Sequence, residues 1–528
     1  PGYKPSTENI PDQQLGFHGT IKYSPIITAI VPGLVSYENI DLKGSYASAN
    51  SDSALNISVS MPRIVYATNS ISNGAVNVNS ANEKINYELK FDTLKTADYT
   101  LYETSVKGAA ANDSILLTAR TQDKAKKDWF AISGTAAINE ETYSFRMKDS
   151  LLLNHEKWNV APGNYLSYSP KGIIVNNLVL TSDTSTISVK SQQLVENSPI
   201  DINIDNFNLK SITSLINQDT VFISGILDAK ANVSELDKAF PGFTGNATIT
   251  DLQYKHHPLG NITASAQKVS DNNIEANIAL SGNGNDITAY ANYYPNETAN
   301  QFDADLAIKK LNFKTLEALS EGQLINTSGD ITGSFMVNGK FIDPRWRGEL
   351  NFDTTSFTIS QLGAPYKIDK QKIIFEYPFI KFPEFTIKDS LNHDLKIEGA
   401  ITLRSMEDIG LNVDINTNDF VFMNARKKVD SELYGHGAAD VSVSVTGTAE
   451  KPIIEGDIQL NSKSDITIVL PESSYEKNDG ATIVRFVDMD TFDIKPHLIG
   501  FREAKKPDVG FASFLNYNLN ISADKEAS

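Results

Sequence analysis

The sequence contains no cysteine among its 528 residues. This excludes a disulfide framework and any catalytic or metal-binding thiolate. The sequence also lacks a run of about 18 apolar residues and a basic segment followed by an apolar stretch, so it predicts neither a transmembrane helix nor a signal peptide. Because the chain opens at Pro1 rather than Met, we expect a fragment or a processed product whose membrane anchors lie outside this chain.

Positive charge is scarce relative to negative charge. The chain has 65 acidic and 47 basic side chains, which gives a net charge of −18. Such a balance argues against non-specific binding to nucleic acid or to an anionic membrane surface. We therefore expect no nucleic-acid partner, and the dispersed acidity is typical of a solubility feature.

Motifs that carry chemistry are also missing. None of the seven histidines has the HExxH, HxH or His-x-x-Glu spacing that gathers metal ligands. The sequence has no GxSxG elbow, no P-loop and no GxGxxG before a helix, and Gly282-Asn-Gly284 reads as a hairpin turn between alternating segments. We expect no catalytic residue, no metal site, no cofactor and no enzymatic activity.

Strict alternation of apolar and polar residues is the dominant pattern. It is clear in Leu411-Asn-Val413-Asp-Ile415 and in Val441-Ser-Val443-Ser-Val445. Successive residues of a strand face opposite sides of a sheet, so each segment predicts a strand with one apolar and one polar face. Gly, Asn, Asp and Pro separate the segments, as turns between antiparallel strands require.

The chain also repeats itself. Residues 202–233 match residues 306–337 at a constant spacing, with Gly225 at the place of Gly329, and a third copy places Gly447 at the position of Gly339. We predict a diverged β-rich segment over 1–200, a repeat over 201–305 with a short helix near 209–216, a repeat over 306–412 with a short helix near 313–320, and a repeat with the start of a C-terminal region over 413–528. In the third copy, 419–424 alternates and is expected to be extended.

The clearest motif is G-x4-P-x3-G-x-apolar. It occurs as Gly339, Pro344, Gly348 and Leu350, and again as Gly447, Pro452, Gly456 and Ile458; we interpret its Gly and Pro residues as structural turns. Ser328-Gly-Asp-Ile leads into the first copy, and Leu362-Gly-Ala-Pro-Tyr366, Leu395-Lys-Ile-Glu-Gly399 and Asp419-Phe-Val-Phe-Met-Asn424 follow. This ordered set resembles the TamB family (translocation and assembly module, within the AsmA-like and bridge-like lipid transfer group), strongly over 320–475, moderately over 200–320 and weakly before that.

The resemblance implies a middle-to-late segment of a periplasmic protein that bridges the inner and outer membranes of a diderm bacterium. It implies phospholipid in an apolar β-groove, an Omp85-family outer-membrane partner similar to TamA, support of outer-membrane protein assembly, and an inner-membrane anchor outside this chain. The lipid carried, its direction, the energy source and the specific partner do not follow from the sequence.

The residues favour a groove on physical grounds as well. An apolar sheet face must be covered by another sheet, by helices or by a ligand, and helical periodicity is scarce here. We therefore predict an all-β protein in which a curled antiparallel sheet forms an elongated groove (β-taco) of repeats with a few short helices. The residues expected to face lipid are Leu350, Phe352, Ile397, Ile401, Leu403, Leu411, Val413, Ile415, Val441, Val443, Val445, Ile466, Ile468 and Leu470.

Two other functions stay open at this point. A scaffold or chaperone could offer sheet edges to strands of outer-membrane proteins. A tandem array of β-sandwiches would instead suit an adhesin-like surface protein, in which the same apolar residues line dry cores.

Overall fold

The computed structural model describes residues 11–49, 53–96, 99–149, 151–216, 223–405, 408–427, 433–469 and 516–527. About 71% of the residues lie in strands and 4% in helices. The chain divides into two units, Pro1–Glu297 and Thr298–Ser528. The all-β, antiparallel fold class predicted from alternation is confirmed. None of the helices in the described ranges is both long and apolar enough to cross a membrane.

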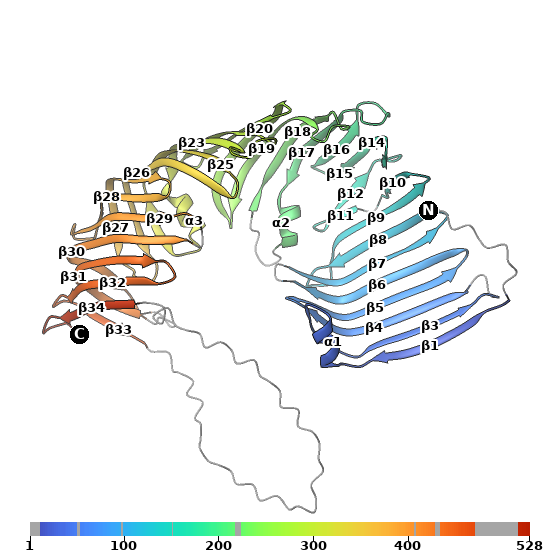
Figure 1. Ribbon diagram of the computed structural model, residues 1–528, viewed down its shortest axis with the longest axis horizontal. Coiled ribbons are helices and arrows are strands. Elements are labelled where there is room, and N and C mark those ends of the chain that lie inside the picture. The colour runs from blue at the N-terminus through green and yellow to red at the C-terminus, as the bar shows by residue number, and fades with distance from the viewer. Residues whose placement is uncertain are drawn as a thin grey trace, which may run out of the picture. The chain divides into compact units, whose positions relative to one another are not determined.

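The first unit contains two helices and 22 strands in its described residues (Figure 1). The helices are α1 (Pro25–Ile30) and α2 (Lys210–Ile216). The strands are β1 (Gln14–Ile21), β2 (Leu34–Tyr37), β3 (Ile40–Ala47), β4 (Leu55–Tyr66), β5 (Asn69–Ala81), β6 (Lys84–Lys95), β7 (Thr100–Ala111), β8 (Ser114–Gln122), β9 (Asp128–Asn139), β10 (Thr142–Met147), β11 (Leu151–Leu153), β12 (Glu156–Val160), β13 (Tyr165–Ser169), β14 (Gly172–Asn176), β15 (Leu178–Thr181), β16 (Thr186–Ser191), β17 (Ile200–Asn208), β18 (Ile223–Ser234), β19 (Gly242–Tyr254), β20 (His257–Ser270), β21 (Asn273–Gly282) and β22 (Asn285–Tyr293).

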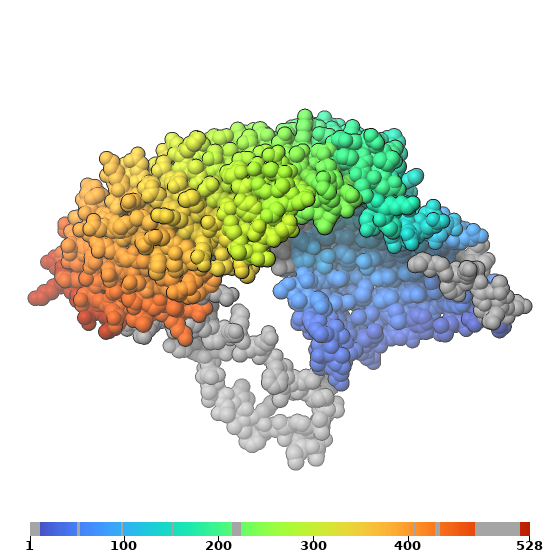
Figure 2. Space-filling model, turned by 45° about the horizontal axis from the view of Figure 1, so that its top comes forward, coloured from blue at the N-terminus to red at the C-terminus, as the bar shows by residue number. Residues whose placement is uncertain are grey.

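The second unit contains one helix and 12 strands in its described residues. The helix is α3 (Phe313–Leu319), and the strands are β23 (Phe302–Asn312), β24 (Leu324–Ser328), β25 (Asp330–Lys340), β26 (Asp343–Ile359), β27 (Pro365–Glu376), β28 (Phe379–Lys388), β29 (Asp394–Leu403), β30 (Ile409–Ala425), β31 (Leu433–Thr448), β32 (Pro452–Leu460), β33 (Asp465–Ile468) and β34 (Asn516–Ala523). Figure 2 shows this unit, from yellow to red, as a continuously packed surface.

Most strands pair antiparallel with the strand that follows them in the chain. In the second unit the pairing runs β25–β26–β27–β28–β29–β30–β31–β32. In the first unit it runs β3–β4–β5–β6–β7–β8–β9 and again β15–β16–β17–β18–β19–β20–β21–β22. Between them the sheet branches, because β9 pairs with both β10 and β11. Strand β34 is different, since it pairs parallel with β32.

A strand–helix–strand arrangement opens both units. In the second unit β23 pairs with β25, β24 pairs with β26, and α3 lies between β23 and β24 in the chain. In the first unit β1 pairs with β3, β2 pairs with β4, and α1 lies between β1 and β2. The first unit therefore begins with the same connectivity as the second, although the sequence repeat was recognised only from residue 202 onward.

The two helices differ in what they cover. Helix α3 starts at Asn312, whose side chain accepts a hydrogen bond from the Lys314 N–H, and it buries Phe313, Thr315 and Ala318. Phe313 packs in a core cluster with Ile331, Phe352, Ile368 and Phe385. Helix α1 buries no residue, and Ile26 and Ile30 are 68% and 71% exposed. The sheet beneath α3 is therefore covered by a helix, whereas α1 leaves its apolar side chains in contact with solvent.

Local predictions from the sequence have clear outcomes. Gly282 and Asn285 are partners across a hairpin, as expected for Gly282-Asn-Gly284, and residues 419–424 lie in β30. The Gly-Pro motif is only partly a turn. Gly339 pairs with Pro344 and Gly447 with Pro452 at hairpin ends, and both glycines have positive φ.

Two glycines of that motif are not in turns. Gly348 and Gly456 lie inside β26 and β32, opposite Phe335 and Val443. A Cβ on Gly348 would lie 2.2 Å from the Ser334 carbonyl oxygen, and a Cβ on Gly456 would lie 2.1 Å from the Ser442 carbonyl oxygen. The interpretation of these two positions as turns is wrong, because close approach of the neighbouring strand, not chain reversal, requires glycine there.

Candidate functional site

One face of the sheet in the second unit is built from apolar rows that cross successive strands. One row follows the paired residues Phe375, Ile380, Ile401 and Leu411 from β27 to β30. Another follows Phe382, Gly399, Val413, Val445 and Ile454 from β28 to β32. Paired residues of an antiparallel ladder point to the same side, so these rows share one surface, here called the apolar face.

The alternate residues make a polar face on the other side. Asn412, Asp414 and Asn416 are exposed, whereas Leu411, Val413 and Ile415 between them are half-buried. Half-burial of the apolar set means that neighbouring side chains shield each residue laterally without closing the surface above it. The second unit therefore presents apolar side chains that are packed together but still accessible.

Twelve of the residues predicted to face lipid lie in this sheet with side chains that are buried or half-buried. Phe352 and Val443 are buried, and the half-buried residues are Leu350, Ile397, Ile401, Leu403, Leu411, Val413, Ile415, Val441, Val445 and Ile466. The registers bring Ile397, Ile415 and Val443 into one row. Their contact with lipid stays a prediction.

The other two predicted positions, Ile468 and Leu470, have different outcomes. Ile466 and Ile468 lie in β33, where they pair with Gly435 and Leu433 of β31. Ile468 is 67% exposed, so it is at the margin of the sheet. Leu470 lies outside the described residues.

Sequence reasoning predicted Leu350 and Phe352 of β26 but missed other residues of the apolar face in β25–β28. Phe335, Trp346, Phe375 and Ile380 belong to it by register, but alternation is blurred there. Met336, between Phe335 and Val337, is apolar yet points to the polar face and is 57% exposed. Gly348, which lies opposite both Phe335 and Phe375, was the signal that could have found these two residues.

The first unit has an apolar face of the same kind, in which no lipid-facing residue was predicted. Its central row runs across seven strands, from β3 to β9, and consists of Leu42, Val59, Val76, Leu89, Val106, Ala119 and Ile132. Further along, in β18–β21, the corresponding row is made of Ala231, Gly245, Ala266 and Ala276. The apolar face is thus lined by bulky residues in one part of this unit and by small ones in another.

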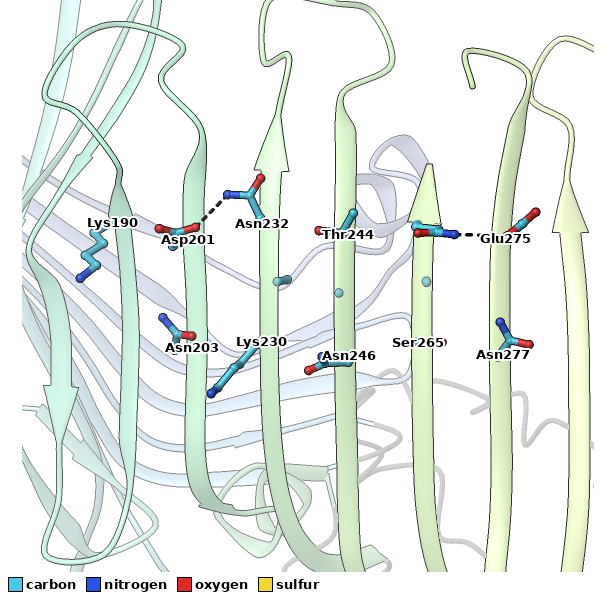
Figure 3. A pocket seen from close by; sticks show the side chains of 14 residues that line it. Lys190, Asp201, Asn203, Lys230, Asn232, Thr244, Asn246, Ser265, Glu275 and Asn277 are labelled. Carbon is cyan, nitrogen blue, oxygen red and sulfur yellow. Dashed lines mark hydrogen bonds between the residues drawn. The ribbon is translucent and has the colours of Figure 1, made fainter. Parts of the chain in front are cut away.

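The polar face in this second part is a ladder of amides, hydroxyls and charges (Figure 3). A shallow trough of about 590 Å³ lies over it, with Lys190, Asn203 and Asn246 among the lining residues. Asn232 donates to Asp201 at 2.8 Å, and Gln267 donates to Glu275 at 3.3 Å. These cross-strand pairs satisfy one another, and no group of His, Asp and Glu in the described ranges is arranged to hold a metal ion.

One buried carboxylate stabilises the sheet end near α3. The Asp389 side chain, fully buried, accepts hydrogen bonds from the backbone N–H groups of Leu391, His393 and Val421 and is 3.0 Å from His393 Nδ1. Burial acts to raise its pKa, but these hydrogen bonds hold the pKa below the usual value. Burial together with Asp389 raises the pKa of Tyr366, whose hydroxyl donates to the Phe422 carbonyl, to about 12. Both groups fix the β30 backbone and have no exposed reactive atom in a cleft.

The comparisons with known proteins give one match. The TamB C-terminal domain matches residues 384–527, which include β29 to β34 and extend beyond residue 475, where the resemblance noted in the sequence fades. Neither the curated proteins nor the solved structures contain a match to this chain. TamB is a family of bacterial envelope proteins linked to outer-membrane protein assembly and lipid transport. The match over residues 384–527 confirms the resemblance to the TamB family.

Proposed function

We propose that this chain is a segment of a periplasmic lipid-transfer protein that conducts phospholipid along its apolar face between the inner and outer membranes. The observation that carries the proposal is the set of accessible apolar rows in both units. In the second unit one row passes from β27 to β30 and the other from β28 to β32. A hydrocarbon chain lying across them exchanges water for aliphatic and aromatic carbon.

The energetic argument is simple. Burial of one methylene contributes roughly 0.8 kcal/mol, so a chain of about 16 carbons meets a cost of about 13 kcal/mol when it passes through water. A surface that supplies apolar contact at every step removes most of this barrier. Such conduction needs no nucleophile, general base or metal, and we propose that the chain is not an enzyme.

Photo-crosslinking tests the proposal with neighbouring residues that point to opposite faces. A benzophenone amino acid at Val413 or Val443, in cells, should capture phospholipid, whereas the same group at Asp414 or Ser444 should not. Val413 is half-buried and Asp414 exposed, so the pair differs in face and not in position along the strand. Capture of neighbouring protein alone at Val413 and Val443 would show that these residues line an ordinary core.

One observation also favours a role with outer-membrane proteins. All eight residues of β1 are exposed, and in the described residues this strand pairs only with β3, so its second edge can accept another strand. We propose that this support, with an Omp85-family partner, accompanies lipid transfer. Crosslinks from β1 to barrel proteins, without any lipid captured from the apolar face, would make scaffolding the main function instead.

A further inference from the structure

The two ends of the strands in the second unit are unequal. At one end lie α3, the 360–364 turn and the loop of Asp389, and the strand residues beneath them are buried, although Leu319 and Leu391 are 48% and 64% exposed. Ile331, Ala364, Tyr366, Phe420 and Met423 are all 5% exposed or less. We call this the covered end. The hairpins β25–β26 and β27–β28 turn at the opposite end, through Phe341-Ile342 and Tyr377-Pro378, and we call it the open rim.

Aromatic side chains gather at the open rim. The ring centroids of Phe335 and Phe375 are 5.0 Å apart, those of Trp346 and Phe375 6.0 Å, and those of Trp346 and Tyr377 5.8 Å. At the hairpin tip Phe341 is 60% exposed and Ile342 is 91% exposed. Apolar side chains are therefore kept at the edge of the sheet, where they meet water, and not only in its middle.

Tyr377 joins the two faces at this rim. Its ring packs on Trp346 of the apolar face, and its hydroxyl donates to Asp343 Oδ1 at 3.1 Å. The guanidinium of Arg345, which starts from the polar face, lies 5.9 Å from the centre of the same ring. Within the described residues Arg345 has no carboxylate partner. The Arg345 guanidinium, which has no ion-pair partner within the described residues, therefore lies beside the boundary between the apolar face and solvent.

Exposed tyrosines also lie at one end of the strands in the first unit. At the strand ends opposite α1, Tyr46, Tyr143 and Tyr168 lie on the apolar face and are 38%, 58% and 57% exposed. Tyr143 and Tyr168 are partners across β10 and β13. At the other end of the strands Tyr37 of β2 is 5% exposed and Trp129 of β9 is 3% exposed, whereas Tyr66 of β4 is 51% exposed.

Tyrosine and tryptophan have an apolar body and a polar tip, and both are favoured where hydrocarbon meets water. Arginine binds phosphate through a planar fork of N–H donors. We propose that bound phospholipid lies with its phosphate headgroup along the open rim, at Trp346, Tyr377 and Arg345, and with its acyl chains directed toward the covered end. This orientation rests on the proposed lipid-binding function of the apolar face.

Two photoactivatable phosphatidylethanolamines test the orientation on the intact chain. One carries a diazirine on the headgroup and the other a diazirine at the end of an acyl chain, and the labelled peptides are found by mass spectrometry. The headgroup probe should label 340–346 and 376–379, and the chain-end probe should label the middle of β29 and β30, around Ile397 and Ile415. Headgroup labelling at the covered end, or equal labelling by both probes, overturns the orientation; no labelling by either probe overturns the proposed function itself.

The role of Arg345 is tested by a matched pair of exposed arginines. Arg345→Gln should reduce the phosphatidylethanolamine bound per chain severalfold and leave binding of diacylglycerol, which has no phosphate, unchanged. Arg426→Gln, at the covered end, should change neither. If Arg345→Gln reduced the binding of both lipids equally, the side chain would only support the fold. If Arg426→Gln reduced phosphatidylethanolamine binding as much as Arg345→Gln, the proposed position of the headgroup at the open rim would be wrong.

Discussion

In the second unit the covered end supplies buried contacts that stabilise the fold, whereas the open rim keeps apolar residues exposed. At the covered end Phe313 of α3 packs on Ile331, Phe352, Ile368 and Phe385, and the cluster is closed to solvent. At the open rim equally apolar residues, such as Ile401 and Leu411, stay half-buried. The difference teaches that one continuous sheet can obtain its folding energy from one end of its strands and keep the other end free for a ligand.

The largest test of this division compares two isoleucines. Ile368→Ala at the covered end should lower the free energy of unfolding by about 2–5 kcal/mol, because it removes buried carbons and leaves a cavity. Ile401→Ala, toward the open rim, should cost about 1 kcal/mol or less, because water can occupy the space. Chemical denaturation of both variants measures the difference, and equal losses would show that the rim is as closed as the covered end.

Asp389→Asn should have the next largest effect. The substitution weakens hydrogen bonds from three backbone N–H groups to a buried carboxylate, and the loss should be about 1.5–3 kcal/mol. The pKa of Asp389 is lowered in the folded chain, so its stabilisation is present above the ordinary aspartate pKa of about 3.9 and is lost as the pH falls through the lowered folded value. Denaturation at several acidic pH values should therefore show a smaller acid destabilisation in Asp389→Asn than in the unmodified chain; identical pH profiles would contradict this account.

Gly348→Ala tests the close approach of strands below the aromatic residues. Its Cβ would lie 2.2 Å from the Ser334 carbonyl oxygen and 2.6 Å from Phe335 Cδ1, so β25 and β26 must separate. We expect a loss of about 1–3 kcal/mol and faster hydrogen exchange in both strands. Gly410→Ala is the milder comparison, because its Cβ would lie 3.3 Å from Thr402 Cβ, a tight contact that a shift of a few tenths of an ångström relieves; a larger loss there would refute the packing argument.

The smallest effect should come from Glu376 at the open rim. Its hydrogen bond with Lys381, 2.6 Å long, lowers its pKa, but the two side chains are 53% and 43% exposed and the pair is screened by water and salt. Glu376→Gln should leave the melting temperature unchanged within error. A drop as large as that of Ile401→Ala would mean that ion pairs, and not apolar contacts, hold the rim together.

Much of the fold followed from residue alternation. The patterns at 411–415 and 441–445 predicted strands with one apolar side, and the registers of β30 and β31 place these residues in shared rows. The helical spacing at 313–320 corresponds to α3. These features are local, so a single sequence is enough to reveal them.

The remainder depended on neighbours that are distant in the sequence. Alternation shows which residues share a side of one strand, but only the register shows that Phe335 and Phe375 flank Gly348. The degree of burial could not be predicted either. Ile368 and Ile401 have similar sequence surroundings, and only packing around α3 buries Ile368 more deeply. The connectivity shared by the α1 and α3 regions could not be predicted, because the two regions have the same strand pairing but different residue types.

The pairing of strands in chain order also bears on how the protein forms. A strand that pairs with its predecessor through a turn of a few residues closes a short loop, so little chain entropy is lost at each step. Strands from β25 to β32 can therefore add one at a time, each new edge serving as the template for the next. Strand β34 pairs with β32 in parallel, so it cannot be added through a short turn in the same way.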